Sequence, residues 1–130
     1  AGLVVPVLRG VQNLDLFGIA QQLAQLLEKA RGGKLAAADT RGGTLTLTNH
    51  GVSGSLIATP IIQQPQVAIL GVGKIERRPA VLNIDGREQL GIATQCFASL
   101  TIDHRALDGF QANGFLSAWV KALECWPPEP

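Results

Sequence analysis

Apolar and polar residues alternate with two different periods along the chain, and these periods separate helices from strands. Between residues 16 and 30, apolar side chains recur every three or four positions, which predicts an amphipathic helix. Asp15 precedes this stripe and is expected to cap the helix, while Gly32-Gly33 is expected to end it. A second helix is predicted from Phe110 to Leu123, ended by Pro127-Pro128.

Three further segments have strand patterns. Residues 3–8 form a short run rich in β-branched side chains, so we expect a buried strand there. Residues 44–48 alternate threonine and leucine, which is typical of a half-buried strand. Residues 67–72 are almost continuously apolar, and we expect them to form a central strand covered on both faces.

A hairpin is predicted around Asp85-Gly86, a dipeptide that tolerates the positive φ angles of a type I′ turn. Its first arm spans residues 80–84, and its second is expected to run as one long strand from residue 89 to residue 102. The fold class that follows is α/β, with a mixed sheet and helices packed on one side.

Composition and charge exclude several classes of protein. With 130 residues, 46% apolar and 16% charged, the chain favours one folded domain over disorder. The 11 basic and 10 acidic residues leave a net charge of +1, so we expect no nucleic-acid partner. No apolar run approaches the ~18 residues of a membrane span, and no membrane partner is expected. Two cysteines far apart favour reduced thiols in the cytoplasm, and no clustered ligand set predicts a metal site.

The chain has only two histidines, and each follows a predicted strand. His104 stands between Asp103 and Arg105, four residues before Asp108. An imidazole at the rim of a buried sheet is able to act as a general base near neutral pH. The alternative interpretation is a solvated Asp-His-Arg corner followed by a helix cap at Asp108-Gly109.

Two hydroxyl side chains near the other histidine are candidates for chemistry. Thr48 ends a strand before a glycine-rich loop, where its hydroxyl is able to donate to an oxyanion, although most strand threonines are simply β-formers. Ser53 lies in a near match to the Gly-x-Ser-x-Gly nucleophile elbow. Because no helix of useful length follows before Pro60, we interpret Ser53 as a loop serine; a serine hydrolase is the minor hypothesis.

Glycines and basic residues between the strands give weaker signals. Gly71-Val72-Gly73 is too short for a dinucleotide fingerprint and predicts a close backbone approach instead. A loose basic group near the hairpin is typical of a solvated face, although an anionic cofactor is able to use such a group. Its members are Lys74, Arg77, Arg78 and Arg87.

The segment from Asp103 to Gly109 resembles the Asp-His-Arg-x-x-Asp-Gly signature of the dihydrolipoyl acyltransferases. These enzymes form the core of 2-oxoacid dehydrogenase complexes and are related in fold to chloramphenicol acetyltransferase. Further blocks are similar to the family's in sequence and order: Gly2 to Val7, Glu28 to Arg31, Gly42 to Asn49, Thr59 to Ile62 and Pro65 to Gly71.

The resemblance implies a chloramphenicol acetyltransferase-like fold, incomplete at its N-terminal side. Residues 1–130 would then be the C-terminal part of a dihydrolipoyl acyltransferase catalytic domain. It also implies coenzyme A as substrate and a lipoyl group carried on a separate domain. The implied partners are further copies of the chain in a trimer, together with the decarboxylase and dihydrolipoamide dehydrogenase of the complex. The implied location is the cytoplasm, or the mitochondrial matrix in a eukaryote.

Roles for three residues follow from the same resemblance. His104 would take the proton of a thiol, from coenzyme A or reduced lipoamide, and Thr48 would stabilise the oxyanion. Asp108 would organise the histidine loop by pairing with an arginine. In the family, each site lies at a trimer interface, where the histidine of one subunit meets the hydroxyl of its neighbour.

The loop after Thr48 departs from the common pattern at His50 and Ser53, so the resemblance leaves the acyl group open among succinyl, acetyl and branched-chain. A different class of function also stays open. The chain is able to serve as a non-catalytic assembly module that keeps the trimer-forming surface without catalysis.

Overall fold

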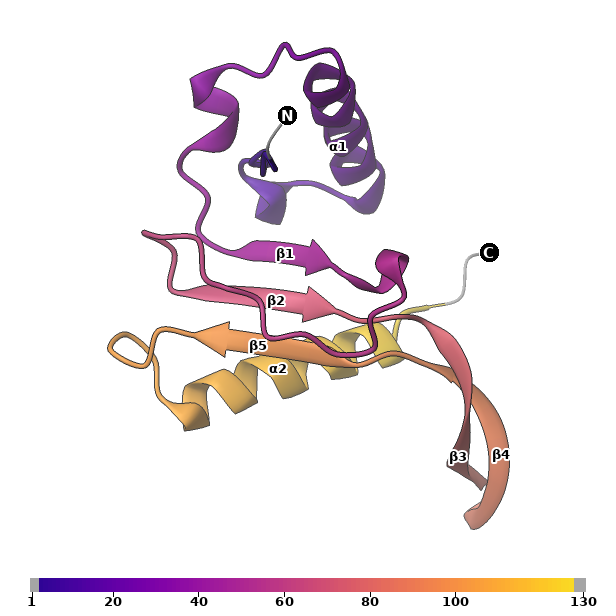
Figure 1. The fold of residues 1–130 in the computed structure, drawn as a ribbon. Helices are drawn as coiled ribbons and strands as arrows, with labels where there is room; N and C mark the ends of the chain where they lie inside the picture. Colours follow the sequence, from indigo (N-terminus) through magenta and orange to yellow (C-terminus); the bar gives the residue numbers. More distant parts are fainter. Residues whose placement is uncertain (1–2, 128–130) are drawn as a thin grey trace. The chain divides into compact units, whose positions relative to one another are not determined.

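In the computed structural model, which describes residues 3–127, the first predicted helix is α1 (Leu16–Arg31; Figure 1). Asp15 caps it, because its Oδ1 accepts a hydrogen bond from the Gly18 N–H at 2.7 Å. The chain leaves the helix through Gly33, whose φ of +65° lies in the left-handed region that favours glycine. Both predicted ends of this helix are confirmed.

The structure divides into two units, one up to Thr44 and one from Leu45 onward. The first unit contains α1 and two short 3-10 turns, η1 (Val11–Asn13) and η2 (Ala37–Thr40). The prediction of a buried strand over residues 3–8 is wrong: they are irregular, and Leu3 is 96% exposed. Pro6 lacks an N–H, and Val7 N–H donates to the Asp39 carbonyl at 2.7 Å rather than to a strand, so no ladder forms.

The second unit is built on a three-stranded sheet of β1 (Thr46–Asn49), β2 (Ala68–Val72) and β5 (Ala98–Ile102). β2 lies in the middle, parallel to β1 and antiparallel to β5 (Figure 1). Its first four residues are buried, which confirms the central strand predicted from residues 67–72. β1 has alternating burial, as the threonine and leucine pattern predicts.

The register of the sheet puts hydroxyl side chains on one face. Residues directly opposite one another on neighbouring strands share a face, and so do alternate residues on one strand. The rows are Thr46, Ile69 and Thr101, and Thr48, Gly71 and Ser99. We call this side the hydroxyl face. The segment 58–66 covers part of it, because Thr46 Oγ1 donates to Gln66 Oε1 at 2.6 Å and Ser99 Oγ donates to the Ala58 carbonyl at 2.7 Å.

A separate hairpin consists of β3 (Glu76–Ile84) and β4 (Arg87–Gln95). Asp85 and Gly86 have φ angles of +52° and +76°, which confirms the predicted type I′ turn. The prediction of a single long second arm is wrong, because the chain leaves β4 at Gln95 and enters the three-stranded sheet at β5. At this point the Phe97 carbonyl accepts from Gly73 N–H at 2.8 Å, and the Arg78 guanidinium lies 5.0 Å from the Phe97 ring centre.

The closing helix is α2 (Gly109–Glu124), which runs beside β5 (Figure 1). It ends before Pro127; Pro128 lies outside the described residues. In the described part of the chain, no helix is both long and apolar enough to cross a membrane. The mixed α/β class is confirmed.

Apolar residues remain exposed at several places in the second unit. The examples are Leu47 at 65%, Val81 at 67%, Leu90 at 82% and Phe110 at 89%. Singly exposed apolar residues are ordinary, but two arms of one hairpin that both expose them form a surface suited to a protein partner.

Candidate functional site

Thr48 lies near the C-terminal end of β1, half-buried on the hydroxyl face. Its register partner is Gly71, which in turn pairs with Ser99. The Ser99 hydroxyl is occupied by the Ala58 carbonyl, whereas the Thr48 hydroxyl has no hydrogen-bond partner within residues 3–127. Thr48 therefore keeps a donor available on this face.

The loop after Thr48 is fixed by local and long-range contacts. Asn49 Oδ1 accepts from the N–H groups of Gly51 and Val52, at 3.0 and 3.3 Å. Gly51 packs against the backbone of Gly73, and Gly73 packs against the Leu56 carbonyl, so a Cβ at either glycine would overlap main-chain atoms. The close backbone approach predicted at Gly71-Val72-Gly73 is confirmed, and this approach holds the loop beside the end of β2.

Ser53 ends the 3-10 turn η3 (Gly51–Ser53) and is exposed. Gly54 follows with φ of +86°, and no α-helix begins there. A nucleophile elbow requires a sharp turn that leads directly into a helix. The interpretation of Ser53 as a loop serine is confirmed.

His104 lies in an exposed turn that follows β5 and is closed by its neighbours. The Asp103 carbonyl accepts from the N–H groups of Ala106 and Leu107, at 2.9 and 3.1 Å, while Asp103 N–H donates to the Val67 carbonyl at 2.8 Å. The turn is therefore anchored to the chain just before β2, and His104 is exposed between Asp103 and Arg105.

The neighbours of His104 form a bidentate ion pair. Arg105 Nε donates to Asp103 Oδ1 at 2.9 Å, and Arg105 Nη2 donates to Asp103 Oδ2 at 2.6 Å. The Arg105 backbone N–H also donates to Oδ1, at 3.0 Å. These hydrogen bonds, the side-chain ones first, lower the pKa of Asp103 from 3.8 to about 2. The carboxylate stays charged at neutral pH and keeps the turn closed.

Asp108 begins α2 as its N-cap. Its Oδ1 accepts from Gln111 N–H at 2.8 Å, and the Gln111 side chain accepts from Asp108 N–H at 3.1 Å. The interpretation of Asp108-Gly109 as a helix cap is confirmed. Asp108 makes no ion pair with an arginine among the described residues, and its role as an organiser of the histidine loop stays a prediction.

Thr48 and His104 lie at opposite ends of the sheet. Thr48 aligns with Ser99 near the start of β5, whereas His104 follows Ile102 at its end. Three residues of strand cover about 10 Å, and the two intervening strand spacings add to this separation. The two candidate residues of one chain are therefore too far apart to contact the same reacting atoms.

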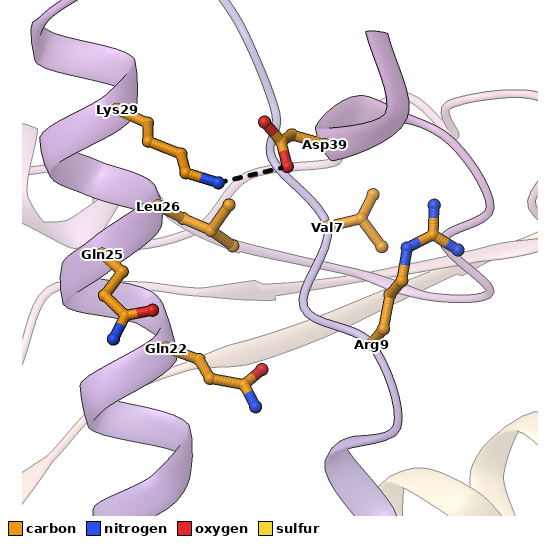
Figure 2. A pocket seen from close by; sticks show the side chains of 7 residues that line it. All are labelled: Val7, Arg9, Gln22, Gln25, Leu26, Lys29 and Asp39. Atoms are coloured by element: carbon orange, nitrogen blue, oxygen red, sulfur yellow. Dashed lines mark ion pairs between the residues drawn. The ribbon is translucent and has the colours of Figure 1, made fainter. Parts of the chain in front are cut away.

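Two open pockets lie elsewhere, one in each unit. In the first unit, an open pocket of about 280 Å³ lies between α1, the N-terminal segment and η2 (Figure 2). Lys29 Nζ lies 3.7 Å from Asp39 Oδ1, and Arg9 Nη2 donates to the carbonyls of Ala38 and Arg41, at 3.0 and 2.7 Å. Because its charged side chains are already engaged, this pocket belongs to the framework of the unit.

The second pocket, about 510 Å³, lies in the second unit beside the His104 turn. Asp103 and Arg105 border it on one side, and residues of the segment 59–66 border it on the other. A substrate that approaches His104 from this side would meet the paired, net-neutral Asp103 and Arg105.

The basic group near the hairpin is partly neutralised. Lys74 Nζ lies 3.1 Å from Glu76 Oε2, and Arg78 Nε lies 3.4 Å from Glu76 Oε1. This pairing favours the solvated-face interpretation over an anion site.

The sequence singled out His50, in the loop after Thr48, only as a departure from the family's common pattern. His50 lies over Gly71, with Nε2 at 3.3 Å from the position that a Cβ on Gly71 would occupy. The signal that could have found it is its spacing of two from Thr48, since alternate residues of a strand share a face.

Known proteins are similar to this chain over nearly its whole length. Residues 1–129 match the family model of the 2-oxoacid dehydrogenases acyltransferase catalytic domain. The acetyltransferase component of the Mycobacterium bovis pyruvate dehydrogenase complex is 41% identical over 95% of this chain and 22% of that protein. The succinyltransferase component of the Haemophilus influenzae 2-oxoglutarate dehydrogenase complex is 46% identical over 95% of this chain and 29% of its own length. The chain thus spans less than a third of these relatives.

Solved structures give the same result. A probable dihydrolipoamide acetyltransferase of Listeria monocytogenes matches with a TM-score of 0.82 and 40% identity. The match covers 95% of this chain and 52% of the Listeria chain. The dihydrolipoamide acetyltransferase of Azotobacter vinelandii, in which a serine, a histidine and an asparagine were investigated for the catalytic mechanism, has a TM-score of 0.85 and 38% identity. This match covers 94% of this chain and 49% of the Azotobacter chain.

Proposed function

Because the chain belongs to the 2-oxoacid dehydrogenase acyltransferase family, catalytic domain, we propose that it transfers acyl groups between coenzyme A and a dihydrolipoyl group. The observation that carries the proposal is the His104 turn, closed by the Asp103–Arg105 pair at the end of β5. The chain has the chloramphenicol acetyltransferase-like fold of the catalytic cores that it matches.

In the proposed reaction, His104 accepts the proton of the attacking thiol. A free thiol has a pKa near 8.5, so a neutral imidazole is a suitable base. The thiolate attacks the thioester carbonyl carbon, and the oxygen becomes an oxyanion that accepts a hydrogen bond from the Thr48 hydroxyl. When the tetrahedral intermediate collapses, the carbon–sulfur bond to the second thiolate breaks, and His104 returns the proton to that sulfur.

The separation of Thr48 and His104 supports a site shared between two copies of the chain. Thr48 of one copy and His104 of another would face the same acyl group, and the proposed assembly is a trimer-based homo-oligomer. A relative with a TM-score of 0.85 and 37% identity is the cubic core of the pyruvate dehydrogenase multienzyme complex, which fits such an assembly. The proposed partners are the decarboxylase and dihydrolipoamide dehydrogenase of a complex in the cytoplasm, or in the mitochondrial matrix of a eukaryote.

The residue types investigated in the Azotobacter vinelandii relative support the assignment. Its histidine and asparagine are four residues apart, as are His104 and Asp108 here. An aspartate has the same shape as an asparagine, and Thr48 supplies the hydroxyl that a serine supplies there. We therefore assign the base to His104, the oxyanion donor to Thr48 and the support of the histidine turn to Asp108.

The proposal is tested on the protein that carries this chain, assayed with dihydrolipoamide and either acetyl-CoA or succinyl-CoA. We expect turnover with at least one of the two, measured as release of coenzyme A. Absence of turnover with both donors, in protein shown to be folded and oligomeric, would contradict the proposal.

The assembly module is the second candidate, and the exposed apolar surface of the hairpin favours it. Calorimetric titration with coenzyme A separates the two. Binding at micromolar concentration is expected for the transferase, whereas an oligomer that takes up no coenzyme A would support the assembly module.

A further inference from the structure

His50 lies on the hydroxyl face close to the proposed oxyanion donor, and nothing in the proposed mechanism uses it. Its N–H donates to the Val72 carbonyl at 3.1 Å, which extends the β1–β2 pairing one residue beyond Asn49. The imidazole then turns over Gly71, the register partner of Thr48. Neighbouring strands lie about 4.8 Å apart, so Thr48 and residue 71, which are directly opposite each other, place their Cβ positions about 5 Å apart.

The contacts around Gly71 show why this position is a glycine. A Cβ there would lie 2.9 Å from Ser99 Oγ, 3.3 Å from His50 Nε2 and 3.3 Å from Pro60 Cγ. The imidazole thus occupies the space that a larger residue on β2 would fill. His50 and Thr48 are neighbours across Gly71, on the same side of the sheet.

The two nitrogens of His50 differ in their surroundings. Nδ1 is buried and has no hydrogen-bond partner in the described chain. An unpaired N–H in a buried position is less well tolerated than an unpaired acceptor. Between the two tautomers of the imidazole, the one with its proton on Nε2 is therefore favoured, and it presents one N–H donor over Gly71.

Of the polar side chains around Gly71, two have a donor to spare. The Ser99 hydroxyl is bound to the Ala58 carbonyl at 2.7 Å. Thr48 Oγ and His50 Nε2 make no hydrogen bond within residues 3–127. Two unused donors on one side of a sheet form an arrangement suited to a single acceptor atom between them.

We propose that His50 is a second hydrogen-bond donor at the acyl group, its Nε2–H reaching the same thioester carbonyl oxygen as the Thr48 hydroxyl. This inference rests on the proposed acyl transfer. It assigns to His50 a role distinct from that of His104: His50 moves no proton and holds the oxygen as negative charge develops on it. Two donors to one oxyanion stabilise the transition state more than one donor does.

The test compares three variants in the protein that carries this chain. His50→Phe keeps a flat ring but removes both nitrogens, and His50→Gln keeps an N–H donor. Val52→Ala is the matched control, since Val52 lies in the same loop and its side chain is 85% exposed. We expect His50→Phe to lower kcat by at least about 10-fold with little change in the KM for acyl-CoA. His50→Gln should recover part of that loss, and Val52→Ala should match the wild type.

A double variant shows whether both donors act on the same oxygen. If they do, Thr48→Val combined with His50→Phe loses less activity than the product of the two single losses. A purely structural role of His50 would instead lower the melting temperature together with activity, and His50→Gln would give no selective rescue of kcat.

A spectroscopic readout is independent of turnover. The carbonyl stretch of ¹³C-labelled acetyl-CoA, bound without an acceptor thiol, should shift to lower frequency in the wild type and less so in His50→Phe. If His50→Phe has the same turnover and the same carbonyl frequency as the wild type, the role of His50 is overturned, and the proposed transferase function is unaffected. A wild-type protein without turnover or coenzyme A binding would overturn the proposed function, and this inference with it.

Discussion

The two ends of the three-stranded sheet are built in different ways. At the Thr48 end, segments distant in sequence come within contact distance through glycines: Gly51 against Gly73, and Gly73 against the Leu56 carbonyl. At the His104 end, the structure comes from residues close in sequence. Asp103 pairs with Arg105, and Asp108 caps α2. One end depends on tertiary packing, and the other is largely local.

This difference bears on how a site divided between the two ends is assembled. A local turn presents His104 on the outside of the sheet, whereas the packed end holds Thr48 half-buried. In the proposed assembly, a second copy that brings its own exposed histidine to the packed end would complete the site without any change in either fold. Catalysis and association would then be linked, because neither end contains both residues.

The largest effect is expected when the variants at the two ends of the sheet are placed on different chains. His104→Ala and Thr48→Val should each lower kcat by at least about 10²-fold, since a general base and an oxyanion donor each contribute that much. When the two variants are assembled together in equal amounts, a site that takes one residue from each neighbour recovers about a quarter of the wild-type activity.

The measurement is turnover after joint refolding or co-expression, compared with the same variants assembled separately and then mixed. Activity that stays at the level of the single variants after joint assembly would contradict the shared site. The separately assembled mixture, assayed immediately after mixing, is the control, because each of its oligomers contains a single variant.

The next effect concerns the packed end alone. Gly73→Ala places a Cβ against the Leu56 carbonyl, so main-chain atoms must move, and we expect a loss of about 3 kcal/mol in the free energy of unfolding. Gly109→Ala is the matched control: nothing lies within 4 Å of its Cβ position, at the start of α2. Urea unfolding of the protein that carries this chain measures both. Equal stabilities for the two variants would show that the close approach carries no energetic weight.

The same contrast explains which features could be predicted from the sequence. Caps and turns depend on a few neighbouring residues, so the Asp15 cap and the Asp85-Gly86 turn were predicted and are confirmed, and the cap at Asp108, an alternative interpretation of the sequence, is observed. Residues 3–8 have a strand composition but no strand partner, and composition alone does not supply a ladder. The position of His50 over Gly71 depends on the pairing of β1 with β2, which no local pattern contains.

Pairing between strands that are distant in sequence also determines where β4 ends and β5 begins. The segment from residue 89 to residue 102 has no internal signal for a change of sheet, yet β4 pairs with β3 and β5 pairs with β2. An interface role for Thr48 and His104 is implied by the family resemblance alone and stays a prediction. Their opposite positions follow from the observed topology.

A smaller effect is expected at the local end from Asp108. Asp108→Ala removes the cap on Gln111 N–H and should cost about 1 kcal/mol in the free energy of unfolding. Asp108→Asn keeps an acceptor oxygen at the same place and should cost less. Chemical denaturation measures the stability, and kcat measured in parallel separates the cap from support of the histidine turn. A loss of kcat in Asp108→Asn at unchanged stability would show that the charge, and not the cap, supports the turn.

The smallest effect is expected from acid acting on Asp103. Its pKa in the folded protein is about 2, below the ordinary 3.8, because Arg105 donates to its charged form. A carboxylate with a lowered pKa stabilises the fold fully above its ordinary pKa, and this contribution is lost as the pH falls from 3.8 towards 2. The contribution is small because the pair is exposed. NMR titration of the Asp103 carboxyl carbon should give a midpoint near 2 in the wild type and a higher one in Arg105→Gln, which keeps only the backbone hydrogen bond to this carboxylate. A wild-type midpoint at the ordinary value would mean that the ion pair does not close the His104 turn in solution.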